Sequence, residues 1–374
     1  MLARQRYLLG VQYIGTKYSG WPPLNVRGEF NSVHYVLEDA LRDLVGMDNV
    51  NNLYVSSRTD GGVHAKRNVF TVDLIRKRRQ HLELLQPHSA QNVHAAVNWS
   101  LRCKQEQIRL LDVTAVANDY DVRQHVYART YEYTLICPSI IDNYNNYNNN
   151  NDNNNNSNNN NSSSSSSSYK EKDLAGAELH HYDKSWFIRS PLDIGAMQRG
   201  AKHLIGSHDF SSFRNIKCQS LTPIRMLYGI TIDAKKLESH TFGDPYMPPV
   251  VVIPPEERIT TGRYVNFNNI DNNIDNNIDN NHIEPVASSS YSQNNRPVRV
   301  TIRITGNAFV YRMVRNMVAS LVEVGKHEFS SDYIKELLLK KDRRECPAAA
   351  PAQGLSLLNV HHTIPNSQFY NSTI

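Results

Sequence analysis

The stretch Leu53-Tyr-Val-Ser-Ser-Arg-Thr-Asp-Gly-Gly-Val-His-Ala65 joins two segments of strand character. Residues 53–56 and, beyond the stretch, residues 69–74 are rich in the β-branched and aromatic types that favour strands. Between them, Asp60 is followed by two glycines, which permit a tight turn that lifts this carboxylate out of a sheet toward a ligand. Asp-Gly-Gly is also common in turns that have no catalytic or binding function. On those three residues alone, a purely structural turn is the favoured interpretation.

Outward from this loop, the apolar residues follow helical spacing in some segments and alternate in others. Residues 33–44 place their apolar side chains on one helical face, and Ser32 and Gly46 are suited to cap the two ends. Two similar groups of strands with interspersed helices predict an α+β fold of two lobes, residues 1–105 with the Asp60 loop and residues 106–374. The further helices are predicted near 89–101, 194–204, 309–325 and 330–340, and the further strands at 6–13, 108–117, 128–137, 224–232, 298–305 and 355–360.

Two polar stretches interrupt this pattern in the second lobe. Asparagine and serine dominate residues 142–178, and residues 239–296 are rich first in proline and then in asparagine. Such compositions cannot bury enough apolar surface to offset the entropy lost on folding, so both stretches are predicted to be disordered. Because loop tips tolerate long insertions, we expect neither stretch to contribute to the chemistry.

The composition excludes several classes of protein. No apolar run approaches the ~20 residues of a membrane span, and the strand pattern begins at Arg6, which leaves almost no room for a signal peptide. We therefore expect an intracellular, cytoplasmic protein that does not enter a membrane, with the nucleus and mitochondria left open. Neither a disulfide framework nor a zinc site is predicted, because no C-x-x-C pair occurs among the four cysteines, Cys103, Cys137, Cys218 and Cys346.

The charge distribution is more informative than its sum. The net charge is +5, from 41 basic and 36 acidic residues, which is too small a surplus to identify a partner. Basic residues gather at 76–79, 296–315 and 340–344. Clusters of one sign suit a polyanion, although each cluster alone is equally consistent with solvated surface charge.

The full octet Ser57-Arg-Thr-Asp-Gly-Gly-Val-His64 carries a more specific signal. It resembles the G-R-T-D-A-G-V-H signature of TruA-type tRNA pseudouridine synthases, and five further blocks follow in the order of that family. They match Y-x-G-x-x-Y-x-G-W at 13–21, R-x-Y-x-Y at 129–133, G-x-H-D-F-x-S-F at 206–213, G-x-x-F-x-x-x-M-V-R-x-(I/M)-V at 306–318 and P-A-x-G-L at 351–355. The resemblance thus extends over nearly all of the chain outside the polar stretches.

Small departures from the bacterial pattern point to one branch of this family. Ser57 stands where bacterial members usually have glycine, Gly61 replaces alanine, and His34 replaces a common glutamine. The consecutive Pro22 and Pro23 replace a polar pair. These features resemble the eukaryotic tRNA pseudouridine synthase-like branch. They leave open which uridine is modified.

The resemblance implies a pseudouridine synthase fold, in which the two lobes and their antiparallel sheets form a central basic cleft around Asp60. Asp60 would be the catalytic nucleophile or base, ionised at neutral pH since the unperturbed pKa of an aspartate is ~3.9. Arg315 resembles the arginine that pairs with this carboxylate, but a phosphate contact or a surface position would also suit it. Tyr131 resembles the tyrosine that stacks on uracil and assists removal of the C5 proton, but a packed strand aromatic fits equally.

Two arginines are further candidates for substrate binding. Arg58 resembles the residue that fills the space left by the flipped nucleotide, with an ion pair to a neighbouring acid as the structural alternative. Arg312 is expected to contact phosphate, together with Arg76, Arg78 and Arg299. The reaction requires no cofactor or metal, and the sequence offers no metal constellation, since His180-His181 and His361-His362 are interpreted as surface histidines.

The predicted function is therefore an RNA pseudouridine synthase acting on tRNA, and the resemblance implies a homodimer. Three alternatives stay open. The chain could be a non-catalytic RNA-binding or assembly factor that keeps the fold, or a synthase acting on mRNA or another RNA. Without the resemblance, Asp60 and His64 would suggest an acid–base hydrolase, although their spacing in a glycine-rich turn leaves their geometry unspecified.

Overall fold

The computed structural model describes residues 4–21, 31–77, 85–141, 183–237 and 297–363. The description below concerns the compact unit within residues 1–237 and 297–374, as far as its residues are described. The two polar stretches at 142–178 and 239–296, as well as Arg78 and His180-His181, lie outside the described residues. The expected disorder of these stretches and the division of the chain at residue 105 stay predictions.

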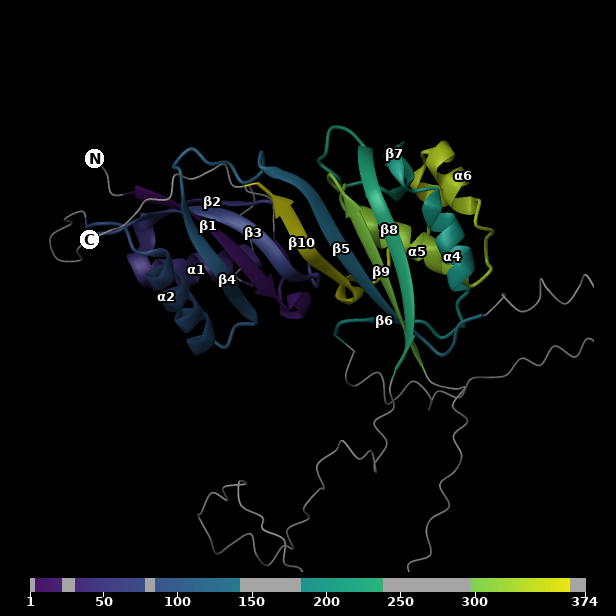
Figure 1. The fold of residues 1–374 in the computed structure, drawn as a ribbon, viewed down its shortest axis with the longest axis horizontal. Helices are drawn as coiled ribbons and strands as arrows, with labels where there is room; N and C mark the ends of the chain where they lie inside the picture. Colours follow the sequence, from purple (N-terminus) through teal and green to yellow (C-terminus); the bar gives the residue numbers. More distant parts are fainter. Residues whose placement is uncertain (1–3, 22–30, 78–84, 142–182, 238–296, 364–374) are drawn as a thin grey trace, which may run out of the picture. The chain divides into compact units, whose positions relative to one another are not determined.

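The first unit is built on one ten-stranded sheet, which confirms the α+β class (Figure 1). The C-terminal strand β10 (Leu355–His362) joins the two predicted groups of strands, because it pairs in parallel with β3 (His64–Ile75) and antiparallel with β5 (Val126–Cys137). Two short strands lie off the main path, with β2 (Val50–Val55) on β3 and β6 (Trp186–Phe187) on β5. The main order is β4 (Ile108–Val116), β1 (Arg4–Tyr13), β3, β10, β5, β9 (Val298–Gly306), β8 (Ile224–Lys236) and β7 (Gly206–Asp209).

The helices begin where the sequence supplies capping side chains. Helix α1 (Val33–Val45) starts at Ser32, whose hydroxyl accepts a hydrogen bond from the backbone N–H of Tyr35, and ends at Gly46 with φ of 89°. Helix α2 (Ala90–Cys103) starts in the same way at Ser89. The other α-helices of the described residues are α4 (Ile194–Lys202), α5 (Met313–Gly325) and α6 (Tyr333–Lys340). None of the described helices is long and apolar enough to span a membrane.

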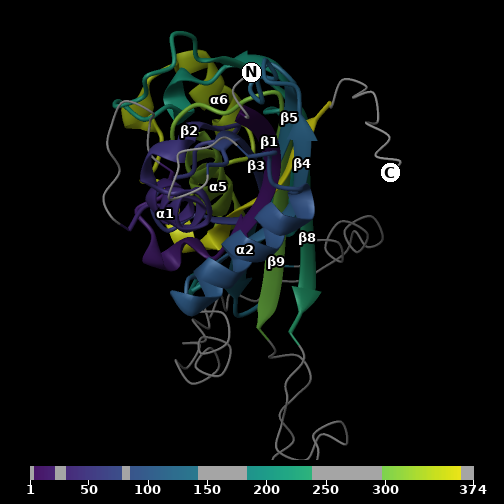
Figure 2. The same ribbon diagram turned by 90° about the vertical axis from the view of Figure 1, so that its left-hand side faces the viewer.

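The sheet has one covered and one open face. Along β9 the side chains of Val298, Val300, Ile302 and Ile304 are buried, while Arg299, Thr301 and Arg303 alternate with them on the other side. In Figure 2, helices α1, α5 and α6 lie on one side of the strands. We call the side of the buried β9 residues the covered face and the side of Arg299 and Arg303 the open face.

Helix α5 begins four residues later than its apolar spacing predicts. Arg312 adopts a left-handed conformation with φ of 61°, which no residue of a right-handed helix can have, so the helix starts at Met313 rather than at Phe309. The predicted residues that remain outside the helix, Phe309 to Arg312, form a turn that lines the pocket described below. The same segment therefore supplies both a buried helix and part of a site.

Candidate active site

The Asp60 loop connects β2 to β3 and is held by the segment before α1. Trp21 donates its backbone N–H to the carbonyl of Thr59 at 2.9 Å, and Gly62 donates to the carbonyl of Tyr18 at 3.1 Å. Gly20 has a φ of 93°, and a Cβ atom there would lie 2.5 Å from the Thr59 carbonyl oxygen. Only glycine permits this close approach. The contact therefore fixes the position of residues 13–21 relative to the octet at 57–64.

A buried polar network supports the loop from below. The Tyr13 hydroxyl and Thr59 Oγ1 are 2.9 Å apart, and the amide of Asn68 donates to the carbonyl of Ser57 at 2.8 Å. Asn68 also accepts a hydrogen bond from the Ser56 hydroxyl at 3.1 Å. Asn68 is fully buried, so loss of any partner would leave an unsatisfied polar group. This network holds the backbone on both sides of Asp60.

Asp60 forms an ion pair with Arg315, although 255 residues separate them in the sequence. Arg315 Nη1 donates to Asp60 Oδ2 at 3.1 Å, and the two side chains are only 12% and 19% exposed. A second hydrogen bond, from Arg315 Nε to the carbonyl of Ala350 at 2.6 Å, orients the guanidinium. The ion pair therefore joins the loop between β2 and β3 to the first turn of α5.

Tyr131 lies in the same pocket on the covered face of β5. It is 8% exposed, and its ring meets that of Phe309 edge to face at a centroid distance of 5.1 Å. Burial, with a smaller contribution from the Asp60 charge, raises the pKa of Tyr131 to about 12. The phenol is therefore protonated at neutral pH and can donate a hydrogen bond.

All five predicted site residues line one pocket of about 680 Å³: Arg58, Asp60, Tyr131, Arg312 and Arg315. Arg58 Nη1 donates to Gln219 Oε1 at 3.3 Å, rather than to an acid. Arg312 lies 5.2 Å from the Tyr311 ring centroid. Arg299, expected to bind phosphate beside Asp60, lies on the open face and lines a different pocket. Arg76 donates to the carbonyl of Gln86 at 3.3 Å and lines neither pocket.

The sequence interpretation missed two half-buried arginines that complete the lining, Arg129 and Arg225. Arg129 donates to Ser57 Oγ at 2.8 Å and to the carbonyls of Ser56 and Asn307 at 3.0 and 2.6 Å, and burial lowers its pKa. Arg225 also lines the pocket and donates to Ser220 Oγ at 2.5 Å. A signal for Arg129 was present, because it opens the R-x-Y-x-Y block and shares the face of Tyr131.

The pocket has a strongly positive lining. Asp60 is the only acid among the described residues that line it. A single carboxylate surrounded by cations is suited to a polyanionic substrate whose chemistry depends on one charged group. The cations are Arg58, Arg129, Lys217, Arg225, Arg312 and Arg315.

The geometry does not support an Asp60–His64 acid–base pair. His64 Nδ1 accepts the backbone N–H of Gly15 at 3.0 Å, and Nε2 lies 2.9 Å from the carbonyl oxygen of Gln353. Both ring nitrogens are thus occupied by backbone groups, and His64 does not line the Asp60 pocket. Within the described parts of the chain, no group of three or more His, Cys, Asp or Glu side chains could hold a metal ion.

An α+β sheet with a paired carboxylate in a cationic pocket is typical of an enzyme that acts on nucleic acid. A family model described as tRNA pseudouridine synthase matches residues 201–362. A tRNA pseudouridine synthase A of Brucella anthropi is 24% identical over 363 residues, which cover 96% of this chain and 99% of the relative. One of Salmonella arizonae is 28% identical over 354 residues, 95% of this chain and 88% of the relative. Over nearly its whole length the chain is thus similar to TruA-type tRNA pseudouridine synthases. Its place in the eukaryotic branch stays a prediction.

Proposed function

We propose that this protein is a tRNA pseudouridine synthase that uses Asp60 as its catalytic nucleophile or base. The reaction breaks the N1–C1′ bond of uridine, turns the uracil and joins C5 to C1′. The proton on C5 leaves, and N1 gains one, so atoms and electrons balance without a co-reactant. The observation that carries the proposal is the Asp60–Arg315 ion pair in a cationic pocket, in a chain similar to this family over nearly its whole length.

The pocket residues suit distinct steps of this reaction. Arg315 holds the Asp60 carboxylate in the pocket, where it can attack the ribose or base or remove a ribose proton. Tyr131 offers a ring for stacking on uracil and a protonated phenol beside it. A phenol whose pKa is about 12 is a weak acid, so we assign to Tyr131 the positioning of the base and contact with the leaving C5 proton.

The cationic lining supports a substrate of phosphate-linked nucleotides. Arg58 lies at the rim with Gln219, where it could enter the stack vacated by a flipped nucleotide. Arg312 is free of carboxylate ion pairs among the described residues and is assigned to phosphate. The pocket would then be the centre of a basic cleft between the lobes at 1–105 and 106–374. A cytoplasmic location and a homodimer, expected from the sequence and the family, belong to the same proposal.

The experiment that tests the function is release of tritium from tRNA transcribed with uridine tritiated at C5. The wild-type protein should release one tritium for each target uridine, because rejoining through C5 expels that atom. Tight tRNA binding without release would overturn the enzyme assignment and leave an RNA-binding or assembly factor. Mapping pseudouridine in total RNA from cells with and without the gene identifies the position, and sites confined to mRNA would overturn tRNA as the substrate.

A further inference from the structure

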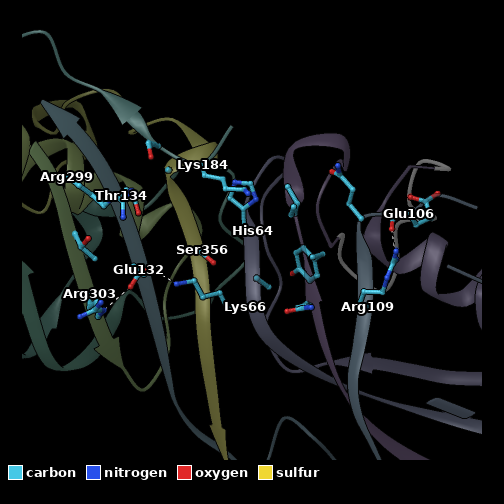
Figure 3. A pocket seen from close by; sticks show the side chains of 18 residues that line it. His64, Lys66, Glu106, Arg109, Glu132, Thr134, Lys184, Arg299, Arg303 and Ser356 are labelled. Atoms are coloured by element: carbon cyan, nitrogen blue, oxygen red, sulfur yellow. Dashed lines mark hydrogen bonds and ion pairs between the residues drawn. The ribbon is translucent and has the colours of Figure 1, made fainter. Parts of the chain in front are cut away.

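A second hollow of about 810 Å³ lies on the open face of the sheet (Figure 3). Strands β5 and β10 contribute to both sites through consecutive residues. Tyr131 and Leu355 line the Asp60 pocket, while Glu132 and Ser356 line the open-face hollow. Because neighbouring residues of a strand point to opposite faces, the two sites lie back to back across the same strands.

The open-face hollow carries an excess of positive charge. Glu132 is held between Lys66 Nζ at 2.8 Å and Arg303 Nε at 2.9 Å, as the dashed lines of Figure 3 show. The Glu132 side chain is only 11% exposed, whereas those of Lys66 and Arg303 are 58% and 47% exposed. The carboxylate therefore fixes the two cations while both remain partly exposed, and Arg303 Nη1 also lies 3.5 Å from the exposed Asp233 Oδ2. Among the described lining residues, five cations, Lys66, Arg109, Lys184, Arg299 and Arg303, outnumber the two acids Glu106 and Glu132.

The second carboxylate is also engaged. Glu106 accepts a hydrogen bond from the Tyr18 hydroxyl at 2.7 Å. Arg109 donates to the backbone carbonyls of Glu106 and Ile108, both at 2.6 Å, so its guanidinium is held at the edge of the hollow. Glu132 is thus paired with two cations and Glu106 accepts from one phenol, so the surplus of cations in the lining favours an anionic ligand.

The other lining groups offer hydrogen bonds but no stacking surface. Tyr13 is the only aromatic ring of Phe, Tyr or Trp among the described lining residues, and it is 3% exposed with its hydroxyl bonded to Thr59. His64 is bonded through both ring nitrogens. Single-stranded bases are held largely by stacking, whereas phosphates need charge and donors. The polar donors are Gln12, Gln107, Thr134, Ser185, Thr301 and Ser356.

We propose that the open-face hollow binds backbone phosphates of a folded substrate RNA, as a second RNA contact outside the uridine pocket. The inference rests on the proposed function for the identity of the RNA. The hollow spans side chains of β3, β5 and β9 and residues such as Lys184 beside β6, a breadth that suits successive phosphates of a backbone. Contacts to phosphates do not distinguish one base from another. The hollow would therefore contribute affinity and salt dependence to RNA binding, but not the choice of uridine.

The test compares two RNAs with the full chain. A complete tRNA transcript can reach both faces, whereas a short single-stranded uridine oligonucleotide occupies the Asp60 pocket alone. The variant is Lys184→Gln with Arg299→Gln, which leaves the Glu132 ion pairs in place. Its matched control, Lys184→Arg with Arg299→Lys, keeps both charges. A second control, Lys202→Gln with Lys335→Gln, removes two cations from α4 and α6, outside both linings.

The neutral variant should bind the tRNA transcript on the order of tenfold more weakly at physiological salt. The slope of the logarithm of its association constant against the logarithm of the salt concentration should become less negative by about 1.4 to 1.8. The oligonucleotide should bind as to wild type, and both controls should behave as wild type with both RNAs. Equal weakening of both RNAs, or unchanged tRNA binding, would overturn the proposal. Binding of inorganic phosphate that the variant loses, without any change in tRNA affinity, would also overturn it.

A second variant removes the central ion pairs without leaving a buried charge. Replacing both cations, by Lys66→Gln with Arg303→Gln, would leave the Glu132 carboxylate unpaired, so the two changes are combined with Glu132→Gln. The triple variant should reproduce the selective loss of tRNA affinity, and wild-type affinity in a folded triple variant would contradict the proposal. Tritium release by the wild type is scored separately. Its absence would remove the proposed function, while a selective loss of tRNA affinity would still support the hollow.

Discussion

The Asp60 pocket and the open-face hollow are both cationic and share two strands, yet they differ in how their acids are used. In the pocket, Asp60 is the only acid of the described lining, is paired with one arginine and shares the space with the aromatic ring of Tyr131. In the hollow, Glu132 is covered by two cations and no exposed ring of Phe, Tyr or Trp is found among the described residues. A cluster of positive charge alone therefore indicates a surface that binds a polyanion. A carboxylate beside an aromatic ring that can stack on a base indicates a catalytic site.

The largest effect is expected from Asp60→Asn, because it removes the carboxylate that only the Asp60 pocket offers as a catalytic group. The amide keeps the shape but cannot act as nucleophile or base, so pseudouridine formation should fall to background while tRNA affinity stays within a few-fold of wild type. Single-turnover tritium release measures the first quantity and filter binding the second. Retention of more than about a hundredth of the activity, a barrier increase below ~2.7 kcal/mol, would remove the proposed role.

Arg303→Gln in the otherwise unchanged chain is the matched control for this variant. It alters a carboxylate–arginine pair of the hollow, so tritium release from the short oligonucleotide should be unaffected. Equal losses for Asp60→Asn and Arg303→Gln on that substrate would erase the functional difference between the two sites.

Stability should depend on the close contact that positions the Asp60 loop. Gly20→Ala adds a Cβ 2.5 Å from the Thr59 carbonyl oxygen at a φ of 93°, so we expect a loss of about 2 to 4 kcal/mol in the free energy of unfolding. The control is Gly229→Ala on β8, where an added Cβ meets nothing within 4 Å. Urea unfolding should leave that variant within about 0.5 kcal/mol of wild type. Equal urea midpoints of unfolding for the two variants would show that the contact between Gly20 and the Thr59 carbonyl is not tight.

Local sequence patterns predicted much of the framework. Ser32 and Gly46 identified both ends of α1, and the alternation from Val298 to Ile304 identified the buried face of β9. The same alternation places Arg299 on the face opposite the buried side chains of β9. Its position on the open face was therefore predictable from the sequence. The expectation that Arg299 binds phosphate beside Asp60 treated a cluster in the sequence as a cluster in space.

Long-range pairing could not be read in this way. The insertion of β10 between β3 and β5 depends on strands about 290 and 230 residues away, and no local period encodes such a neighbour. The left-handed Arg312 was hidden because its neighbours, Phe309 and Met313, keep helical spacing. The Asp60–Arg315 pair was reached only through the family blocks, since charge alone offered many equivalent partners for Asp60.

A smaller effect is expected from Arg58→Ala, which tests whether the pocket also holds a flipped nucleotide. Arg58 now donates to Gln219 at the rim, and its proposed role begins only after the uridine has left its stack. A structured tRNA fragment should therefore bind nearly normally but turn over on the order of tenfold more slowly, about 1.4 kcal/mol in the barrier. A short unstructured RNA has no stack to replace and should lose little. Equal losses on both RNAs would reduce Arg58 to a structural or phosphate-binding arginine.

The smallest effect is expected from shortening the polar stretches, which tests whether both sites are complete without them. Deleting residues 143–168, and separately 266–281, removes mainly asparagine and serine from the connections before β6 and before β9. Every residue assigned to the pocket and to the hollow stays in place, including Lys184 and Arg299. Turnover and the salt dependence of tRNA binding should both remain near wild type, because shortening such loops changes the closure entropy by only ~0.6 kcal/mol per halving. A folded deletion variant with normal oligonucleotide turnover but a shallower salt slope would extend the RNA contact of the open face into the deleted stretch. A folded variant that loses turnover on both RNAs would instead make that stretch part of the Asp60 pocket.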